Sequence, residues 1–435
     1  MSRAGWRPGA PAPEPPPPPG VRVVLDARPV QDPERAPRTA AYLDGLLGAL
    51  DADPRPGESF SLLLAADLDD PTDRWPHLDI VGRRLLPPTR LLRSAALTVD
   101  PILLRGASVG AGWHAERGGA AGAVYHAAAG ALPLGSGIPV VATVLDLAPW
   151  QLAGTYQRGA AARLGQRLRA RLLRDAAMVI VPSTATAVEA RRLLRVRQAR
   201  IRVIPLAARA AFRPEAAAGA ARERERLGLA GRYAVYAGRY DARQDLPMLL
   251  DALARLAAEP PPVPGDATAI GATTAAATDV SWPPRICLVG ATPDDRAALS
   301  RAAVRAGIPD LLAYAPRLPD DRLAALVAGA RFLVQPARTD ASALPAIEAI
   351  AAGVPVVASA VGALPETVGA AGILVEPGDA GRLATALRAA WLDDDLHATL
   401  AAATRERPAA TRTWTDVARE TREVWAAVAA PAPLI

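Results

Sequence analysis

The sequence predicts an α/β protein with two doubly wound parallel sheets, one in each half of the chain. Short apolar runs alternate with helical segments, a pattern typical of buried parallel strands joined by crossover helices. The alternation occurs twice, on either side of an alanine- and charge-rich stretch at residues 213–230. The 435 residues also suffice for two or three domains. We therefore expect an N-terminal domain over residues 21–212 and a C-terminal domain over residues 213–410.

The N-terminal half begins with a proline-rich stretch, residues 1–20, which we expect to be a disordered tail. Residues 67–120 mix arginines with apolar residues without a clean period, so no element is predicted there. Elsewhere in this half we expect a helix at 184–194 and strands at 21–27, 59–66, 121–127, 138–146, 176–183 and 200–206.

The C-terminal half shows the pattern more clearly. We expect strands at 233–238, 285–290, 311–315, 331–336, 354–359 and 372–377, and helices at 244–257, 294–306, 319–329, 344–352 and 379–392. Residues 259–284 are rich in proline, alanine and threonine and lack any period, which predicts a disordered insertion. Ligands of such sheets bind beyond the carboxyl ends of the strands, so two facing sheets predict one deep cleft between the domains.

Composition narrows the possible partners. The net charge of +6 allows nucleotide diphosphates or anionic lipid as partners, but no basic run is interleaved with aromatic residues, so we expect no nucleic acid. Cys287 is the one cysteine, which excludes a disulfide framework and a CxxC metal site. Its apolar surroundings favour a buried, inert thiol. Without a signal-like or membrane-spanning apolar run, the sequence predicts a cytoplasmic protein.

The pair Gly238-Arg239 stands where the strand at 233–238 ends. Glycine lets the backbone turn and a ligand come close, and the planar guanidinium of arginine matches phosphate oxygens. The pattern therefore indicates a phosphate site. Alternatively, Arg239 is a surface residue paired with Asp241 or Asp245.

A second group of polar residues surrounds the helix at 344–352. Asp340 precedes this helix and Glu348 lies inside it, so the two carboxylates are eight residues apart. Ionised carboxylates accept hydrogen bonds from vicinal hydroxyls, so the pair suits a sugar and a ribose. Free backbone amides at the helix start, around Ser342, Ala343 and Leu344, suit a diphosphate. The alternative is that Asp340 caps the helix and Glu348 pairs with an arginine.

Two further features have open interpretations. His126 follows an apolar run and could face the cleft as an acid–base group or acceptor ligand, or it could be a satisfied core residue. The segment 156–175 carries six arginines among leucines and alanines. A basic amphipathic helix of this kind can lie on anionic lipid, although an ordinary packed helix with a solvated basic face fits the pattern too.

Taken together, these stretches resemble the retaining glycosyltransferases of family 4. The resemblance lies in YAGRYDARQDLPMLLDAL, in the region from LPDDRLAALVAGARFLVQPARTD to GRLATAL, and in TWTDVARETREVW. In the N-terminal half, residues 176–214 match the strand–helix–strand of the same family. The resemblance spans roughly residues 121–426 and is dense in 231–391.

The resemblance implies a GT-B fold, in which two Rossmann-like domains face each other across a cleft and a C-terminal helix, here 411–429, crosses back onto the first domain. It implies a nucleotide-diphosphate sugar as donor and no cofactor or metal. Arg239 matches the family arginine that holds the donor diphosphate. Asp340 and Glu348 occupy the places of the glutamates that contact the donor sugar and the ribose.

The sequence departs from the family pattern at several of these positions. Gln244 stands where the family has a second diphosphate-binding lysine, and Arg243 could compensate for it. Asp340 is shorter than the usual glutamate and is followed by Ala341-Ser342-Ala343 instead of Gly-Phe-Gly. In the N-terminal half, Leu145-Asp146 replaces His-Asp, and RTAAY at 38–42 replaces a glycine-rich loop.

From these features we expect a glycosyltransferase that uses Arg239, Asp340 and His126 in catalysis on a glycan, lipid or small-molecule acceptor. The departures leave a second hypothesis open. In it, the protein is a catalytically degenerate GT-B scaffold that binds a nucleotide sugar or a glycan, or partners an active transferase.

Overall fold

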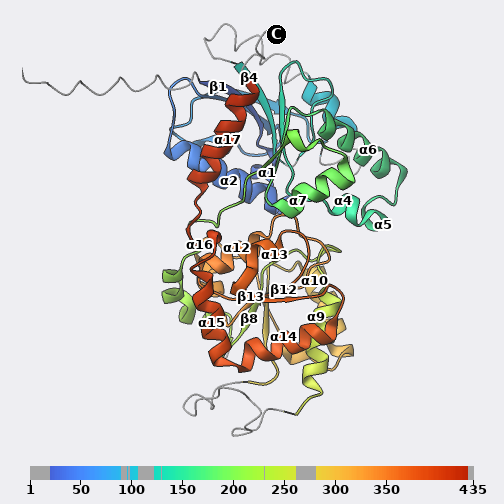
Figure 1. Ribbon diagram of the computed structural model, residues 1–435, viewed down its shortest axis with the longest axis vertical. Coiled ribbons are helices and arrows are strands. Elements are labelled where there is room, and N and C mark those ends of the chain that lie inside the picture. The colour runs from blue at the N-terminus through green and yellow to red at the C-terminus, as the bar shows by residue number, and fades with distance from the viewer. Residues whose placement is uncertain are drawn as a thin grey trace, which may run out of the picture.

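Two α/β domains build the protein, one above the other in Figure 1. The computed structural model describes residues 20–89, 96, 98–105, 122–128, 130–229, 231–260 and 281–429. Each domain has one wholly parallel sheet, which confirms the predicted fold class. The expected tail at 1–20 and the expected insertion at 259–284 lie almost entirely outside the described residues.

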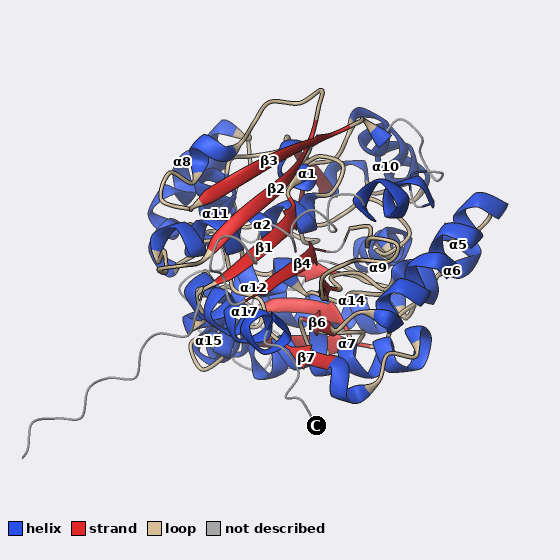
Figure 2. Ribbon diagram, turned by 90° about the horizontal axis from the view of Figure 1, so that it is seen from above, coloured by secondary structure: helices blue, strands red, loops and turns tan. Residues whose placement is uncertain are grey.

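The first sheet has seven strands in the order β3-β2-β1-β4-β5-β6-β7, and Figure 2 shows them from above. The strands are β1 Val21–Asp26, β2 Ser59–Ala65, β3 Ile80–Leu86, β4 Gly122–Ala128, β5 Val140–Thr143, β6 Met178–Val181 and β7 Ile201–Val203. The described helices are α1 Arg28–Gln31, α2 Pro37–Ala52, α4 Ala148–Gln151, α5 Ala153–Tyr156, α6 Ala160–Asp175 and α7 Thr184–Glu189, which continues as the π-helical turn η3 Ala190–Leu194.

The second sheet has six strands in the order β10-β9-β8-β11-β12-β13, which is the Rossmann order. The strands are β8 Ala234–Tyr236, β9 Ile286–Val289, β10 Leu312–Ala315, β11 Leu333–Gln335, β12 Val356–Ser359 and β13 Gly372–Val375. The helices are α8 Ala220–Arg226, α9 Leu246–Ala257, α10 Pro293–Arg305, α11 Asp320–Ala328, α12 Leu344–Ala351, α13 Leu364–Val368, α14 Ala380–Leu392, α15 Asp394–Thr404 and α16 Pro408–Thr411. The strand order reverses between β8 and β11, so a ligand site is expected where these strands end.

The last helix, α17 Trp414–Ala429, returns to the first domain. Trp425 of α17 is 1% exposed and packs edge-to-face on Phe60. Arg422 of the same helix forms ion pairs with Asp53 and Glu58, each at 2.8 Å. This helix therefore completes the core of the first domain by both apolar burial and charge pairing.

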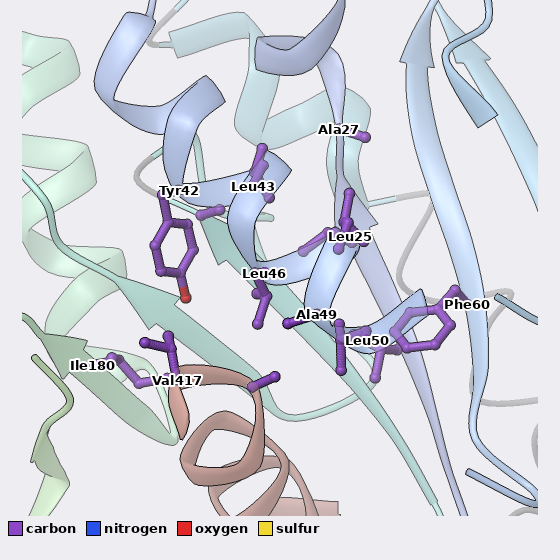
Figure 3. Packing of buried hydrophobic residues seen from close by; sticks show 14 of the residues in the cluster. Leu25, Ala27, Tyr42, Leu43, Leu46, Ala49, Leu50, Phe60, Ile180 and Val417 are labelled. Atoms are coloured by element: carbon purple, nitrogen blue, oxygen red, sulfur yellow. The ribbon is translucent and has the colours of Figure 1, made fainter. Parts of the chain in front are cut away.

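Helix α2 was not predicted from the sequence. The segment RTAAY at 38–42, expected to replace a glycine-rich loop, lies in the first turns of this helix. Pro37 stands at its start, where a missing amide hydrogen costs nothing. Figure 3 shows Tyr42 and Leu46 of α2 packed in the same apolar cluster as Val417 of α17. The departure from the glycine-rich loop thus lies in a helical turn, where alanine and leucine favour a helix.

Candidate donor-binding cleft

A cleft of about 1010 Å³ lies between the two domains. The second domain lines it with the loops that follow β8, β9 and β10 and with helix α12, and the first domain lines it with α2. The lining residues fall within 33–49, 208–212, 237–241, 289–295, 317–323, 344–351 and 409–415. The cleft therefore occupies the carboxyl edge of the second sheet, where a doubly wound fold binds its ligands.

Gly238 and Arg239 both line this cleft just beyond β8. A Cβ on Gly238 would lie 2.6 Å from the hydroxyl of Tyr236, so glycine leaves the room that this buried ring needs. The Arg239 side chain is 30% exposed, and its Nε donates to Asp241 at 3.0 Å. The alternative interpretation, in which Arg239 pairs with Asp241, is therefore observed. Arg239 nevertheless lines the cleft.

Gln244 and Arg243 lie outside the cleft lining. Gln244 is 4% exposed, and neither polar atom of its amide has a hydrogen-bond partner. The Arg243 guanidinium donates to Asp146 at 2.5 Å and also pairs with Asp241. Burial alone would lower the pKa of Arg243, but these carboxylates raise it. Arg243 thus ties the two domains together, and it does not place a charge where the family lysine would stand.

Asp340 is buried, and its carboxylate is fully engaged. One oxygen, Oδ1, accepts from the amides of Ser342 at 3.0 Å and Ala343 at 2.8 Å. The other, Oδ2, accepts from Gln335 at 2.7 Å and from Arg38 of α2 at 2.8 Å. Two of the amides expected to meet a diphosphate, those of Ser342 and Ala343, therefore donate to Asp340, which caps the loop before α12.

Glu348 lines the cleft and is held by Arg209, a residue of the segment that links the two domains. The pair is bidentate, with Nε to Oε1 at 2.6 Å and Nη2 to Oε2 at 3.0 Å. Arg209 also donates to Asp320 at 2.5 Å and lies over the ring of Phe212. Burial alone would lower the pKa of Arg209, but the two carboxylates raise it, so the guanidinium stays charged.

His126 does not face the cleft, so that interpretation was wrong. The ring is 0% exposed and lies between β5 and α17. Its Nδ1 accepts a hydrogen bond from Trp425 Nε1 at 3.2 Å, and its Nε2 contacts Thr143 Oγ1 at 2.8 Å. Burial lowers the pKa of His126 to about 3. Strand β4 points this side chain into the core, where it is a satisfied neutral residue, which was the alternative interpretation.

Sequence reasoning missed two residues of the site, Arg38 and Arg209. Each approaches one of the two motif carboxylates, from 302 and 139 residues away in the chain. The only signal in the sequence was their charge within alanine-rich stretches, RTAAY and LAARAAF. The predicted residues that do line the cleft are Gly238, Arg239, Leu344 and Glu348, whereas Ser342 and Ala343 are buried beneath it.

Metal-binding and membrane-spanning features are absent from the described residues. Within those ranges, no three His, Cys, Asp or Glu side chains gather closely enough to hold a metal ion. Cys287 is buried in β9, and burial raises the pKa of its thiol to about 12. Over the same part of the chain, every helix is too short or too polar to cross a bilayer.

Family profiles match both domains. The profile of Glycosyl transferases group 1 matches residues 231–393, and that of Glycosyltransferase Family 4 matches residues 69–209. Among curated proteins, MMP alpha-(1->4)-mannosyltransferase of Mycolicibacterium hassiacum is 44% identical over 84 residues, 19% of this chain and 20% of that protein. D-inositol 3-phosphate glycosyltransferase of Streptomyces avermitilis is 37% identical over 131 residues, 30% of this chain and 28% of that protein. The chain therefore aligns with well under half of either relative.

Solved structures reproduce the whole fold. Sucrose-phosphate synthase from Thermosynechococcus elongatus superimposes with a TM-score of 0.67 at 22% identity, covering 93% of this chain and 98% of that one. HepE of Anabaena, in complex with UDP-glucose, gives a TM-score of 0.62 at 16% identity, covering 93% and 99%. With a family profile matched in each half and the GT-B fold shared throughout, the chain belongs to the family 4 glycosyltransferases, group 1.

Proposed function

We propose that the protein transfers a sugar from a nucleotide-diphosphate sugar to an acceptor with retention of anomeric configuration. The observation that carries this proposal is the convergence of Arg239 and Glu348 on one cleft at the switch point of the second sheet. That edge is where doubly wound domains bind nucleotides. HepE, which shares the fold, was solved with UDP-glucose.

In this proposal Arg239 contacts the donor diphosphate and stabilises the charge that builds up on it as the sugar departs. Electrostatic stabilisation of a leaving group in a partly dry site usually contributes more to such catalysis than any other effect. Glu348 accepts hydrogen bonds from the ribose hydroxyls. Asp340 orients the sugar through Arg38, which lines the cleft, because both oxygens of Asp340 are already occupied. His126 has no part in the reaction. No metal is required.

The test is donor turnover by the full chain with a panel of UDP-, GDP- and ADP-sugars. Arg239→Ala should lower donor turnover about 100-fold or more, the range seen for loss of one transition-state donor. Its melting temperature should stay within a few degrees, because Arg239 is partly exposed and pairs only locally. Arg305→Ala is the matched control, since this residue is exposed on α10 and lies outside the cleft. Equal turnover by Arg239→Ala and the unmodified protein would refute the role.

The acceptor, a glycan, lipid or small molecule, binds in this proposal to the half of the cleft formed by α2. The residues that α2 presents there are mostly small, including Ala41, Gly45 and Gly48. Such a face leaves room for a ring or chain against the helix. Gly48→Leu should therefore raise the acceptor KM without changing donor affinity, because a Cβ at Gly48 meets no atom within 4 Å, whereas one at Gly45 would collide with Trp414.

We also propose that a basic surface on the first domain rests on anionic lipid. Residues 156–197 carry ten arginines and two acids, more net positive charge than the +6 of the whole chain. Exposed arginines of α6 lie beside η3, with its own exposed Arg191 and Arg192, and Leu164 is 61% exposed among them. Each arginine near an anionic surface contributes about 1 kcal/mol. The predicted cytoplasmic location would place this surface at the inner face of a membrane.

Vesicle sedimentation tests the basic surface. The full chain should bind phosphatidylglycerol vesicles and not phosphatidylcholine vesicles, and a variant with Arg163, Arg167 and Arg171 changed to glutamine should lose most of that binding. The control changes Arg296, Arg301 and Arg305 to glutamine, three arginines that are exposed on the second domain. Equal loss in the control would show that only total charge matters, and no binding by the unmodified chain would refute the proposal.

The second candidate function is a catalytically degenerate protein that binds a nucleotide sugar or glycan, or partners an active transferase. The observation that favours it is that Asp340 and Glu348 are both taken by arginines. Donor binding by calorimetry without turnover, over every donor and acceptor tried, would select this alternative.

A further inference from the structure

We infer that Arg209 is the second cation of the donor diphosphate site, in place of the charge missing at Gln244. This inference rests on the proposed donor-binding function and adds a residue to the same cleft. The diphosphate of a nucleotide sugar carries two negative charges, and charge-assisted contacts with several cations are the usual way to bind it. The cleft therefore needs a cation besides Arg239 close to where the ribose lies.

The two neighbouring candidates cannot supply that cation. Gln244 is neutral, is 4% exposed and lies outside the cleft lining. Arg243 is also outside the lining, and its guanidinium is fixed by Asp146, Asp241 and the hydroxyl of Tyr156. Its side chain is 12% exposed, so moving it would break an ion pair that joins the domains.

Arg209 has the position that the site requires. It lines the cleft together with Arg239 and directly contacts Glu348, the carboxylate that we assign to the ribose. The diphosphate is attached to the ribose through one methylene group, so a cation beside the ribose carboxylate is also within reach of the phosphate oxygens. Phe212 supports the guanidinium from one face, which holds it near the cleft.

The present partners of Arg209 leave it able to change contacts. Asp320, which accepts from Nη1, is 54% exposed, and an exposed ion pair is weak and readily replaced. When ribose hydroxyls donate to the Glu348 carboxylate, they replace N–H groups of the Arg209 guanidinium there. These N–H groups can then donate to the diphosphate. Arg209 thus pairs with two carboxylates in this structure and, when a donor binds, with its diphosphate.

The experiment compares binding of nucleoside diphosphates and of nucleosides without phosphate by calorimetry, with UDP, GDP, uridine and guanosine as probes. Arg209→Ala should weaken diphosphate binding about 10- to 100-fold, the value of one charge-assisted contact. Nucleoside binding should change less than about threefold, because no phosphate is then present. Arg209→Lys keeps the charge but loses the planar guanidinium. Its affinity for diphosphates should lie between those of the unmodified protein and Arg209→Ala.

The matched control is Arg317→Ala, which removes the same charge from an exposed position lining the same cleft. An equal loss in this control would overturn the inference, as the effect would then be the general charge of the cleft. Tighter binding of both ligand classes by Arg209→Ala would also overturn it, because Arg209 would then merely block Glu348. Equal weakening of both classes would leave Arg209 as a ribose-side positioning residue and overturn the diphosphate role.

The failure of this inference is distinguishable from failure of the proposed function. If the unmodified protein binds no nucleoside diphosphate, the donor site itself is wrong and Arg209 has no such role. If it binds diphosphates and Arg209→Ala, folded by circular dichroism, binds them equally well, the proposed function stands and only the role of Arg209 is refuted. Arg209→Lys supplies the second variant should the alanine variant not fold.

Discussion

Acidification should destabilise the protein through His126, because the unfolded chain takes up a proton there that the buried ring of the folded protein does not, and the structure gives the size of the effect. Trp425 Nε1 can only donate, so His126 Nδ1 must accept and the proton of the neutral ring must be on Nε2, facing Thr143. A doubly protonated ring would set an N–H against the N–H of Trp425. With burial, this arrangement keeps the pKa of His126 near 3, against 6.5 in an exposed chain.

The direction of the pH effect follows from these two pKa values. As pH falls through about 6.5, the unfolded chain takes up a proton at this position, whereas folded His126 stays neutral down to about 3. The stability that His126 contributes is complete above pH 6.5 and is lost as the pH falls. At about 1.4 kcal/mol per pH unit, the loss between pH 7 and pH 5 is about 2 kcal/mol.

Two measurements on the full chain check this prediction. In an NMR titration of the four histidines, one ring resonance should stay unshifted down to about pH 4.5, and it should be absent from His126→Gln. In urea, the free energy of unfolding of the unmodified protein relative to His126→Gln should fall by about 2 kcal/mol between pH 7 and pH 5. A resonance with a midpoint near 6, or a difference that does not change with pH, would refute the reasoning.

Three further predictions concern the cleft. Arg38→Ala should lower the free energy of unfolding, measured in urea, by about 2–4 kcal/mol, because it leaves the Asp340 carboxylate buried without its cation. A loss below about 0.5 kcal/mol would contradict this. Ala343→Gly should raise the free energy of unfolding by about 1 kcal/mol, because Ala343 has a left-handed φ of +49°, which glycine adopts without strain. A variant less stable than the unmodified protein would contradict this prediction. Dialysis against EDTA should leave donor turnover unchanged, and a loss restored by Mg²⁺ or Mn²⁺ would show that a metal takes part.

The predicted fold agrees with the structure because buried parallel strands have a strong sequence signal. The predicted strand with the run ICLV is observed as β9, which is fully buried. The predicted helix after Gly238-Arg239 is observed as α9, whose start is capped by Asp245 accepting from the amide of Met248. The strand β3, IVGRRLL, was missed because it lies at the sheet edge. Most of its residues are exposed or half-exposed, so an edge strand of this kind has no continuous apolar run.

The candidate site was predicted only in part, for a physical reason. A strand-end Gly-Arg pair and a carboxylate inside a helix are local features, and Gly238, Arg239 and Glu348 do line the cleft. The partners of the carboxylates are not local. Arg38 reaches Asp340 from the other domain, and such long-range pairing depends on how the domains meet, which no spacing in the sequence encodes.

Because the sequence contains no lysine, the cation in each contact between the domains at the cleft is an arginine. Arg38, Arg209 and Arg243 hold Asp340, Glu348 and Asp146, and each contact joins a domain to the other domain or to the linker between them. Arginine stays protonated at any pH that a protein tolerates, and its fork binds a carboxylate at two points. The cations of the cleft therefore do not titrate in the physiological range. Any pH dependence of donor binding must come from the carboxylates and from the phosphates of the donor, and it should be the same whichever arginine holds the diphosphate.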